Sequence, residues 1–427
     1  PSAFVGLYLL GAGRGQWRSS RPNNMPPSLS TKTSSTDYPA VRSSSTSGEF
    51  AFGIIADVQW ADAPDGTNYA KTVRRHYRGA LNVLGNAVDW WLSLSNEDED
   101  DEHEPPLSFI AQLGDLIDGK NNAAQLDQTD AAMKAALDRL DRLPCPSVNL
   151  VGNHELYNFN RKELAEQPWL RHGDKEYYSF SPAEGWRVIV LDSYQIALIG
   201  HDENDPRRLE AVELLARENP NVSPDGADGD WFVGMEDAGY RRRFVPYNGG
   251  FGREQLDWFR AEVASAARAG ERVLILSHVL LHPKAGGGST MAWDYEEALE
   301  VVRSEEANGC VAAVLCGHDH KGHYHRDEFG VHHCTFRSPL NKGEEGKAFG
   351  MMRVSADCLE IVGPAVDDLL PDVEERPWST VIEDDAIPGP CESIKLLLSD
   401  ANKSNVLRKE EKIRTSTEAD QEIIVAS

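Results

Sequence analysis

Five short motifs along the chain carry side chains that can bind metal ions or transfer protons. They are Asp57-Val58-Gln59, 114–119 (GDLIDG), 152–155 (GNHE), Ser277-His278 and 317–320 (GHDH). Each motif directly follows an apolar run that is typical of a buried strand. Open α/β sheets collect their ligands at the carboxyl ends of the strands. We therefore expect the polar side chains of all five motifs to converge on one site.

The donor atoms in these motifs suit a pair of divalent cations. Carboxylate and amide oxygens come from the first three motifs and imidazole nitrogens from the last two: Asp57, Gln59, Asp115, Asn153, His278, His318 and His320. This mixture of donors favours hard or borderline ions. Residues two positions apart in an extended segment point to the same side, so the paired ligands of the first and last motifs can act together. The carboxylate of Asp115 can bridge two ions.

The segments around the motifs predict strands that alternate with helices. Apolar runs typical of strands lie at 51–56, 107–113, 148–151, 187–191, 273–276 and 311–316. Between them, apolar residues recur every three or four positions from Val73 to Trp91, around 133–143 and around 256–263, which indicates helices. After Gly330 the pattern is that of strands alone, at 331–336, 349–354 and 358–362. We predict a four-layer α/β/β/α sandwich.

Composition divides the chain into three parts. Residues 1–48 are rich in Ser, Thr, Pro and Arg and cannot form a core, so they are either a transit peptide or a disordered extension. Residues 49–365 form the predicted catalytic domain, with insertions near 96–104 and 202–250. Residues 366–427 are expected to form a mobile tail, with a weak helical pattern at 394–398.

Charge and cysteine content limit the partners. The chain has 427 residues, with 43 Lys and Arg against 69 Asp and Glu, and its formal net charge of −26 opposes binding to nucleic acid. Its six cysteines lack CxxC spacing and fit free thiols in a reducing compartment. No apolar stretch reaches the ~18 residues that span a bilayer. We expect a soluble, intracellular monomer, in the cytoplasm or in an organelle if the N-terminal 48 residues are a targeting signal.

The motifs, in their order, resemble those of the calcineurin-like metallophosphoesterase superfamily over about 49–365. Most members have His at the position of Gln59. The family that uses Gln there, and that this chain resembles most, is the manganese-dependent ADP-ribose/CDP-alcohol diphosphatase family. The likeness extends to Asn68-Tyr69, 74–78 (RRHYR), 152–159 (GNHELYNF) and 292–295 (AWDY).

The resemblance implies which residues bind each metal. One ion is implied to bind Asp57, Gln59, Asp115 and His320, and the other Asp115, Asn153, His278 and His318. His154 is implied to be the catalytic histidine and not a ligand. The amide of Gln59 makes the first site three oxygens and one nitrogen, which favours Mn²⁺, with Mg²⁺ and Zn²⁺ as alternatives.

The implied activity is hydrolysis of the diphosphate bond of ADP-ribose or CDP-alcohols by a hydroxide that bridges two metals. Tyr69 offers a face on which a nucleobase could stack, and Arg75 is expected near the diphosphate. Two alternatives remain open: another dinuclear phosphodiesterase or phosphomonoesterase, acting on a cyclic nucleotide or phospholipid-type substrate, and a non-catalytic binding module on the same fold.

Several polar residues near the motifs are expected to have supporting roles. Asp118 is predicted to be a structural hydrogen-bonding group near Asp115. Four histidines close to the GHDH motif are predicted to lie at the surface or behind the ligands: His323, His325, His332 and His333. The arginines at 74, 75 and 78 form either a solvated helix face or a phosphate-binding group.

Overall fold

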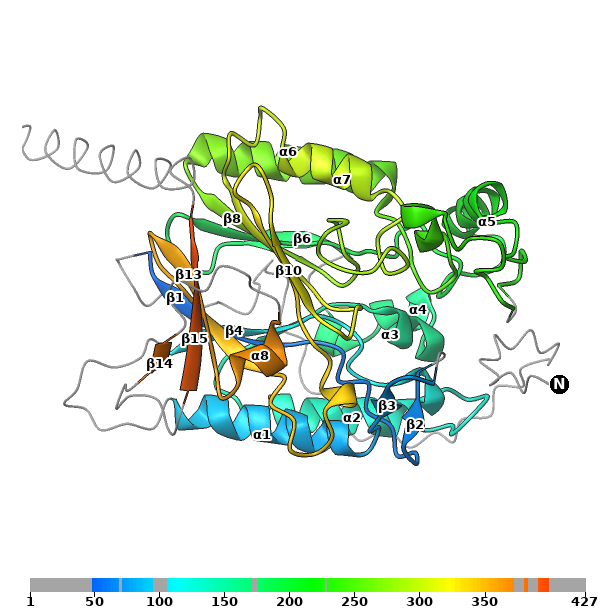
Figure 1. Ribbon diagram of the computed structural model, residues 1–427, viewed down its shortest axis with the longest axis horizontal. Helices are drawn as coiled ribbons and strands as arrows, with labels where there is room; N and C mark the ends of the chain where they lie inside the picture. The colour runs from blue at the N-terminus through cyan, green and yellow to red at the C-terminus, as the bar shows by residue number, and fades with distance from the viewer. Residues whose placement is uncertain are drawn as a thin grey trace, which may run out of the picture.

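The structure is a computed structural model that describes residues 48–68, 71–94, 106–170, 176–226, 229–371, 380–382 and 391–398. Two large sheets lie face to face between two layers of helices (Figure 1). One sheet is covered by α1 (Gly79–Ser93) and α2 (Thr129–Leu140), and the other by α6 (Gly252–Ala269) and α7 (Tyr295–Val302). The predicted four-layer α/β/β/α arrangement is confirmed. Within the described residues, no helix is long and apolar enough to cross a membrane.

The first sheet has seven strands, and its parallel strands carry the early motifs. Its order is β14 (Thr380–Ile382), β15 (Cys391–Leu397), β13 (Cys358–Gly363), β12 (Gly350–Val354), β1 (Phe50–Ile55), β4 (Leu107–Gln112) and β5 (Ser147–Asn149). The last three strands run parallel to one another, and the others pair antiparallel. Its outer face packs on α1 (Gly79–Ser93) and α2 (Thr129–Leu140).

The second sheet has six strands and carries the late motifs. Its order is β10 (His323–Arg326), β11 (His332–Thr335), β9 (Val311–Cys316), β8 (Arg272–Ser277), β7 (Trp186–Val190) and β6 (Tyr178–Phe180). The four central strands are parallel and the two edge strands antiparallel. Its outer face packs on α6 (Gly252–Ala269) and α7 (Tyr295–Val302).

Burial on both faces explains why the strands read as continuous apolar runs. In β1, Phe52 and Ile54 point into the core between the two sheets, while Ile55 packs in the cluster beneath the helices. In β8, Leu274 and Leu276 join the core between the sheets. A strand covered on both faces has no position at which a polar side chain reaches water.

Smaller elements connect the layers. They are β2 (Gly66–Thr67), β3 (Arg74–Arg75), η1 (Gly119–Asn121), α3 (Asn153–Asn158), α4 (Arg161–Ala165), η2 (Pro168–Leu170), α5 (Pro206–Glu218), η3 (Gly239–Arg243), η4 (Pro339–Asn341) and α8 (Val366–Leu369). The helix predicted from Val73 begins at Gly79, because β2 and β3 pair as a short hairpin that takes up the preceding residues.

The chain does not leave the core at residue 365, so the expected boundary is too early. The strand β15 pairs with β13, and α8 packs beside them. The prediction of a helix at 394–398 is wrong, because these residues belong to or directly follow β15. Ile394, Leu396 and Leu398 alternate into the core between the sheets, which is the period of two of a strand that covers an otherwise open sheet edge. The other residues expected in the tail lie outside the described residues.

The insertion at 202–250 is a packed structure on the side of the second sheet. It holds α5 and η3, and its apolar side chains form a small cluster that includes Leu215, Phe244 and, from outside the insertion, Trp293. The insertion expected at 96–104 and the extension at 1–47 lie outside the described residues. Cysteine side chains within the described part are free: Cys145, Cys310, Cys316, Cys334 and Cys358.

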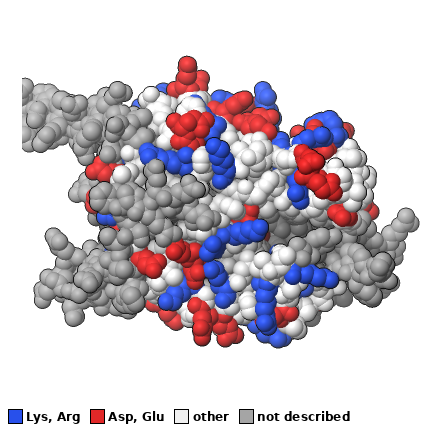
Figure 2. Space-filling view, in the orientation of Figure 1, with Lys and Arg blue, Asp and Glu red and all other residues white. Residues whose placement is uncertain are grey.

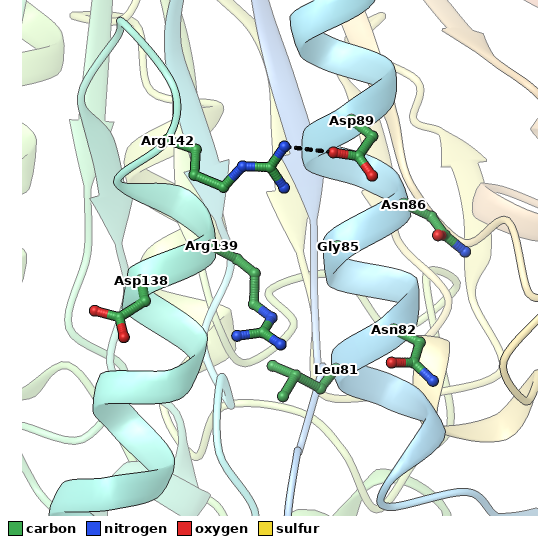
Figure 3. Close-up of a pocket in the computed structure, with 8 residues that line it drawn as sticks. All are labelled: Leu81, Asn82, Gly85, Asn86, Asp89, Asp138, Arg139 and Arg142. Carbon is green, nitrogen blue, oxygen red and sulfur yellow. Dashed lines mark hydrogen bonds and ion pairs between the residues drawn. The ribbon is translucent and has the colours of Figure 1, made fainter.

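A polar groove of about 380 Å³ runs between α1 and α2 on the outer surface (Figure 3). Arg142 and Asp89 form an ion pair of 2.6 Å across it. It contains no residue of the five motifs, so it is a seam between helices and not the predicted site. Acidic and basic side chains are interspersed on the face shown in Figure 2, with Lys and Arg across its middle.

Candidate metal centre

The five motifs meet where the carboxyl ends of the two sheets come together. Residues of the first two motifs follow β1 and β4, and Asn153 begins α3 after β5. His278 follows β8, and His318 and His320 follow β9. All the predicted ligands are buried or nearly so, although they come from positions up to 263 residues apart in the sequence. The expected convergence is therefore present.

Asp115 lies in the middle of this group. Its Oδ2 accepts a hydrogen bond of 2.9 Å from Nε2 of Gln59 and lies 3.5 Å from Nε2 of His278. The same Nε2 of Gln59 is 2.9 Å from Nε2 of His320. Nε2 of His320 in turn lies 3.5 Å from Oδ1 of Asp57. One carboxylate thus contacts residues of both proposed ion sites.

A second set of donor atoms meets at the same carboxylate. One ligand atom from each of Asp115, His278 and His318 lies within 4.8 Å of the others. The imidazole rings of His278 and His318 have centroids 5.0 Å apart. These spacings fit three donors arranged around one cation.

Four of the predicted ligands have backbone conformations that residues other than glycine rarely adopt. The φ angles of Asp57, Gln59, Asp115 and His318 are +51°, +47°, +58° and +68°. Such left-handed residues outside glycine are uncommon, and they concentrate at functional sites where surrounding structure holds them. Here the backbone turns sharply as each strand ends, which directs the side chain across the sheet edge.

Glycines in two motifs allow neighbouring loops to approach closely. A Cβ at Gly152 would lie 2.1 Å from Oδ1 of Asp115, and a Cβ at Gly317 would lie 2.6 Å from Oδ2 of Asp57. Both contacts are far inside van der Waals distance. The glycine of each motif therefore makes room for the carboxylate that the adjacent motif supplies.

Several buried polar atoms of the predicted ligands have no hydrogen-bond partner in the described part of the chain. They are Oδ1 of Asp57, Oε1 of Gln59 and Nε2 of His278. Buried polar atoms are almost always satisfied, because an unpaired one loses its interaction with water and regains nothing. Carboxylate, amide and imidazole lone pairs left free around one centre fit divalent cations.

The protonation of the histidines reflects the crowded charges. Burial lowers the pKa of both His318 and His320 to about 3, so each keeps a free lone pair at neutral pH. Burial would also lower the pKa of His278, but the negative charge of Asp115 outweighs it and raises this pKa to about 9. Burial, with Asp115 nearby, raises the pKa of Asp57 to about 8. Cation binding here would displace protons.

Hydrogen bonds orient the imidazoles of His278 and His318. Nδ1 of His278 donates to the carbonyl of Leu113 at 2.7 Å, which leaves Nε2 for the centre. Nε2 of His318 donates to Oδ1 of Asn248 at 2.7 Å, which leaves Nδ1. The amide nitrogen of Asn248 donates in turn to the carbonyls of Arg243 and Ser289, both at 2.8 Å. Such outer contacts fix which nitrogen faces a metal.

Glu155 supports the first half of the centre and was not assigned a role from the sequence. Its buried carboxylate accepts hydrogen bonds from the backbone N–H groups of Asp115 (2.8 Å), Leu116 (2.7 Å) and Gly152 (2.8 Å). It therefore ties the loop after β4 to the loop after β5. The sequence could have pointed to Glu155, because it is the last residue of the GNHE motif.

Other supporting residues lie outside any motif. Asn248 and Tyr247 come from the 202–250 insertion, and the ring of Tyr247 lies 5.8 Å from that of His318. The hydroxyl of Tyr194 donates to Oδ1 of Asn153 at 3.3 Å. Nothing in the spacing of these residues indicated a link to the centre, because only folding brings them there.

His154 faces the centre with a proton-bearing nitrogen. Its Nδ1 accepts a hydrogen bond of 2.8 Å from the N–H of Gly119, so the proton resides on Nε2, 4.0 Å from Oδ2 of Asp115. Asp118 lies 3.2 Å from Nδ1 and accepts from the N–H of Lys120. Burial lowers the pKa of His154, but Asp115 and Asp118 outweigh burial and raise it. Asp118 thus has the supporting position expected of it.

The arginines after the first motif do not form a helix face, because they lie in and after β3. Arg74 pairs with Asp65 at 2.9 Å and Arg78 with Asp62 at 2.5 Å, both at the surface. Arg75 is half-buried and lies close enough to the centre that its charge lowers the pKa of His320. Tyr69, the predicted base-stacking residue, lies outside the described residues.

Two of the four histidines near the GHDH motif are not at the surface. His332 and His333 are 1% and 2% exposed and belong to β11. His332 contacts the hydroxyl of Tyr324 at 2.8 Å and the carbonyl of Leu397 at 3.0 Å. They are buried because β11 lies inside the second sheet, between β10 and β9.

The calcineurin-like phosphoesterase family matches residues 50–322 of the chain. The chain is 35% identical to the manganese-dependent ADP-ribose/CDP-alcohol diphosphatase of Oryza sativa subsp. japonica, over 76% of this chain and 94% of that protein. It is 33% identical to the Homo sapiens protein of the same name, over 76% of this chain and 93% of that one.

A solved structure has the same fold. The dimetal phosphatase from Danio rerio superposes with a TM-score of 0.66 at 29% identity, covering 82% of this chain and 99% of that one. The chain therefore belongs to the calcineurin-like phosphoesterase family and is a dinuclear-metal phosphohydrolase.

Proposed function

We propose that this chain hydrolyses the diphosphate bond of nucleoside diphosphate derivatives such as ADP-ribose and CDP-alcohols, with Mn²⁺ as its metal. The observation that carries the proposal is the convergence of carboxylate, amide and imidazole donors around Asp115, with several lone pairs left unpaired. Two further facts support it: curated relatives carry the name manganese-dependent ADP-ribose/CDP-alcohol diphosphatase, and Gln59 supplies an amide to the centre.

The proposed ligand set divides at Asp115. Asp57, Gln59 and His320 would hold one ion with it, and the other would take Asn153, His278 and His318. The contacts of Asp115 with Gln59 and with His278 support its bridging role. The first ion would have three oxygens and one nitrogen, a donor set that suits Mn²⁺.

When bound, two divalent cations supply positive charge for the substrate phosphate and lower the pKa of water to near neutrality. The chain's own residues position the substrate and protonate its leaving group. His154 holds a proton on Nε2 facing the centre and can donate it, or a hydrogen bond, to the oxygen of the departing phosphate. Arg75, which is half-buried and close enough to the centre to lower the pKa of His320, would hold the second phosphate of a diphosphate.

A panel of three substrates with Mn²⁺ tests this function. Turnover of ADP-ribose, CDP-choline and an aryl phosphodiester would be followed by release of AMP, CMP and the aryl alcohol. We expect kcat/KM for the two diphosphates to exceed that for the phosphodiester by at least ~10²-fold, because only they present two phosphates to the ions and Arg75 together.

A preference for the aryl phosphodiester would instead favour a general phosphodiesterase. Arg75→Lys keeps the charge but loses the planar fork, and Arg74→Lys is a matched surface control. We expect only the Arg75 variant to raise KM for ADP-ribose. A protein that neither turns over any substrate nor retains Mn²⁺ after dialysis would be a binding module and not an enzyme.

A further inference from the structure

A second cluster of metal-binding side chains lies outside the centre described above. One ligand atom from each of His282, Asp327 and His333 lies within 4.8 Å of the others, and all three residues are buried. The cluster shares no residue with the catalytic group of Asp115, His278 and His318.

A third imidazole, that of His325, lies beside this cluster. The ring of His282 has its centroid 4.4 Å from that of His333 and 4.6 Å from that of His325. His282 lies in the loop after β8, His325 lies in β10 and His333 lies in β11. His333 lies beside Val314 of β9, on the face of the second sheet that α6 and α7 cover.

His333 holds a free lone pair in a buried position. Its Nε2 lies 3.2 Å from Oδ2 of Asp327, so the proton resides on Nε2 and Nδ1 keeps its lone pair. Nδ1 is buried and has no hydrogen-bond partner within the described residues, and the side chain is 2% exposed. A carboxylate that orients one nitrogen of a histidine while the other remains free is the usual arrangement behind a metal ligand.

Asp327 is firmly held and is suited to orient His333. Its Oδ2 accepts from Nε and an NH₂ group of Arg303 at 3.3 and 3.2 Å. Its Oδ1 accepts from the backbone N–H groups of Phe329 at 3.0 Å and Val331 at 2.9 Å. Burial lowers the pKa of His282 to about 3, and burial likewise lowers that of His333 and His325, so all three rings have lone pairs at neutral pH.

The adjacent His332 shows what a purely structural histidine looks like in this hairpin. It is equally buried, yet both of its nitrogens have partners, in Tyr324 and the carbonyl of Leu397. Packing alone therefore does not explain the unpaired nitrogen of His333.

We propose that His282, His325 and His333 form a third, mononuclear metal site for a borderline divalent cation such as Zn²⁺, with Asp327 orienting His333. Three imidazoles suit this class of ion, whereas the oxygen-rich catalytic site suits Mn²⁺. At His282 the metal would replace the 3.1 Å hydrogen bond that Nδ1 accepts from the N–H of Lys284.

A cation at this site would fasten together three segments that lead away from the catalytic centre. His282 follows the ligand His278 by four positions, and the β10–β11 hairpin follows directly after the GHDH motif. The site would therefore stabilise the imidazole-bearing half of the centre without touching substrate.

The number of bound ions tests the proposal. The full chain would be stripped with a chelator, loaded with excess Zn²⁺, desalted and analysed for zinc per chain by mass spectrometry. Relative to the parent protein, we expect His333→Gln and His325→Gln each to lose about one equivalent. The matched control His332→Gln should lose none. The result is a difference between variants, so it does not depend on how many ions the catalytic centre holds.

Thermal unfolding gives an independent readout and guards against misfolding. His325 is half-exposed, so its replacement should leave the melting temperature of the metal-free protein nearly unchanged. Zn²⁺ should raise the melting temperature of His325→Gln less than that of the parent and of His332→Gln. Equal zinc content in the parent, His325→Gln and His333→Gln would overturn the proposal, as would a smaller content in His332→Gln alone.

Discussion

The two halves of the metal centre differ in chemistry and in how they are supported. The first sheet contributes mostly oxygen donors, from Asp57, Gln59 and Asp115. The carboxylate of Glu155 ties the loop of Asp115, after β4, to the loop after β5. The second sheet contributes imidazoles. Neutral acceptors select the free nitrogen of two of them, the carbonyl of Leu113 for His278 and the amide of Asn248 for His318.

The difference follows from what each kind of ligand needs. A carboxylate ligand is fixed by its backbone, so the first half needs groups that hold the N–H groups of tight turns. An imidazole has two nitrogens, and a partner must decide which one faces the ion. The first half is therefore defined by local motifs, whereas the second half depends on residues recruited from elsewhere in the fold.

Removing the group that joins the two halves should have the largest effect. Asp115→Ala leaves two cations repelling each other at close range without a carboxylate between them. We expect kcat/KM to fall by more than ~10³-fold and the bound Mn²⁺ to be lost with it, measured by turnover and metal analysis. The exposed Asp130→Ala in α2 serves as the control. Two tightly retained ions with normal turnover would show that Asp115 is not a bridge.

His154 separates catalysis from metal binding within the first half. His154→Ala should keep both ions but lower kcat by ~10²- to 10³-fold, because it removes a proton donor that acts in the transition state. Single-turnover kinetics and metal content would be measured on the same preparation. If the variant loses metal, His154 belongs to the ligand shell and the first half has one nitrogen more than proposed.

Asn248 tests whether the second half depends on recruited residues. Asn248→Ala removes the acceptor that holds His318, and we expect a loss of ~10- to 100-fold in activity or metal affinity. Asn221→Ala, another amide of the same insertion that bonds the carbonyl of Val233, should leave both unchanged. Equal behaviour of the two variants would mean that the insertion does not orient the ligand.

Gln59 sharpens the contrast between oxygen and nitrogen donors with the smallest expected effect. Gln59→His adds a nitrogen to the oxygen-rich site, so affinity for Zn²⁺ and Co²⁺ should rise relative to Mn²⁺, by about tenfold. Turnover of ADP-ribose and CDP-choline would be compared under each metal in turn. An unchanged metal ranking would indicate that Gln59 is not a ligand, and would weaken the case for the diphosphatase over a general phosphodiesterase.

Much of the fold and of the centre follows from the sequence by itself. The apolar runs and the helical spacing predicted the layers, because strands covered on both faces carry no polar positions and helices carry one apolar face. The five motifs predicted the converging donors, since each motif stands at a strand end. Even Glu155 was within a motif, although its role was not assigned.

The remaining features were decided by tertiary contacts between segments distant in sequence. The strand β15 was expected to be helical, and only the open edge of β13 turned its residues into a strand. Asn248 and Tyr194 carry no local pattern, because a hydrogen bond across 70 or 41 residues has no period in the sequence. The same holds for His282 and His333, which are neighbours only because β8, β9 and β11 lie parallel in one sheet.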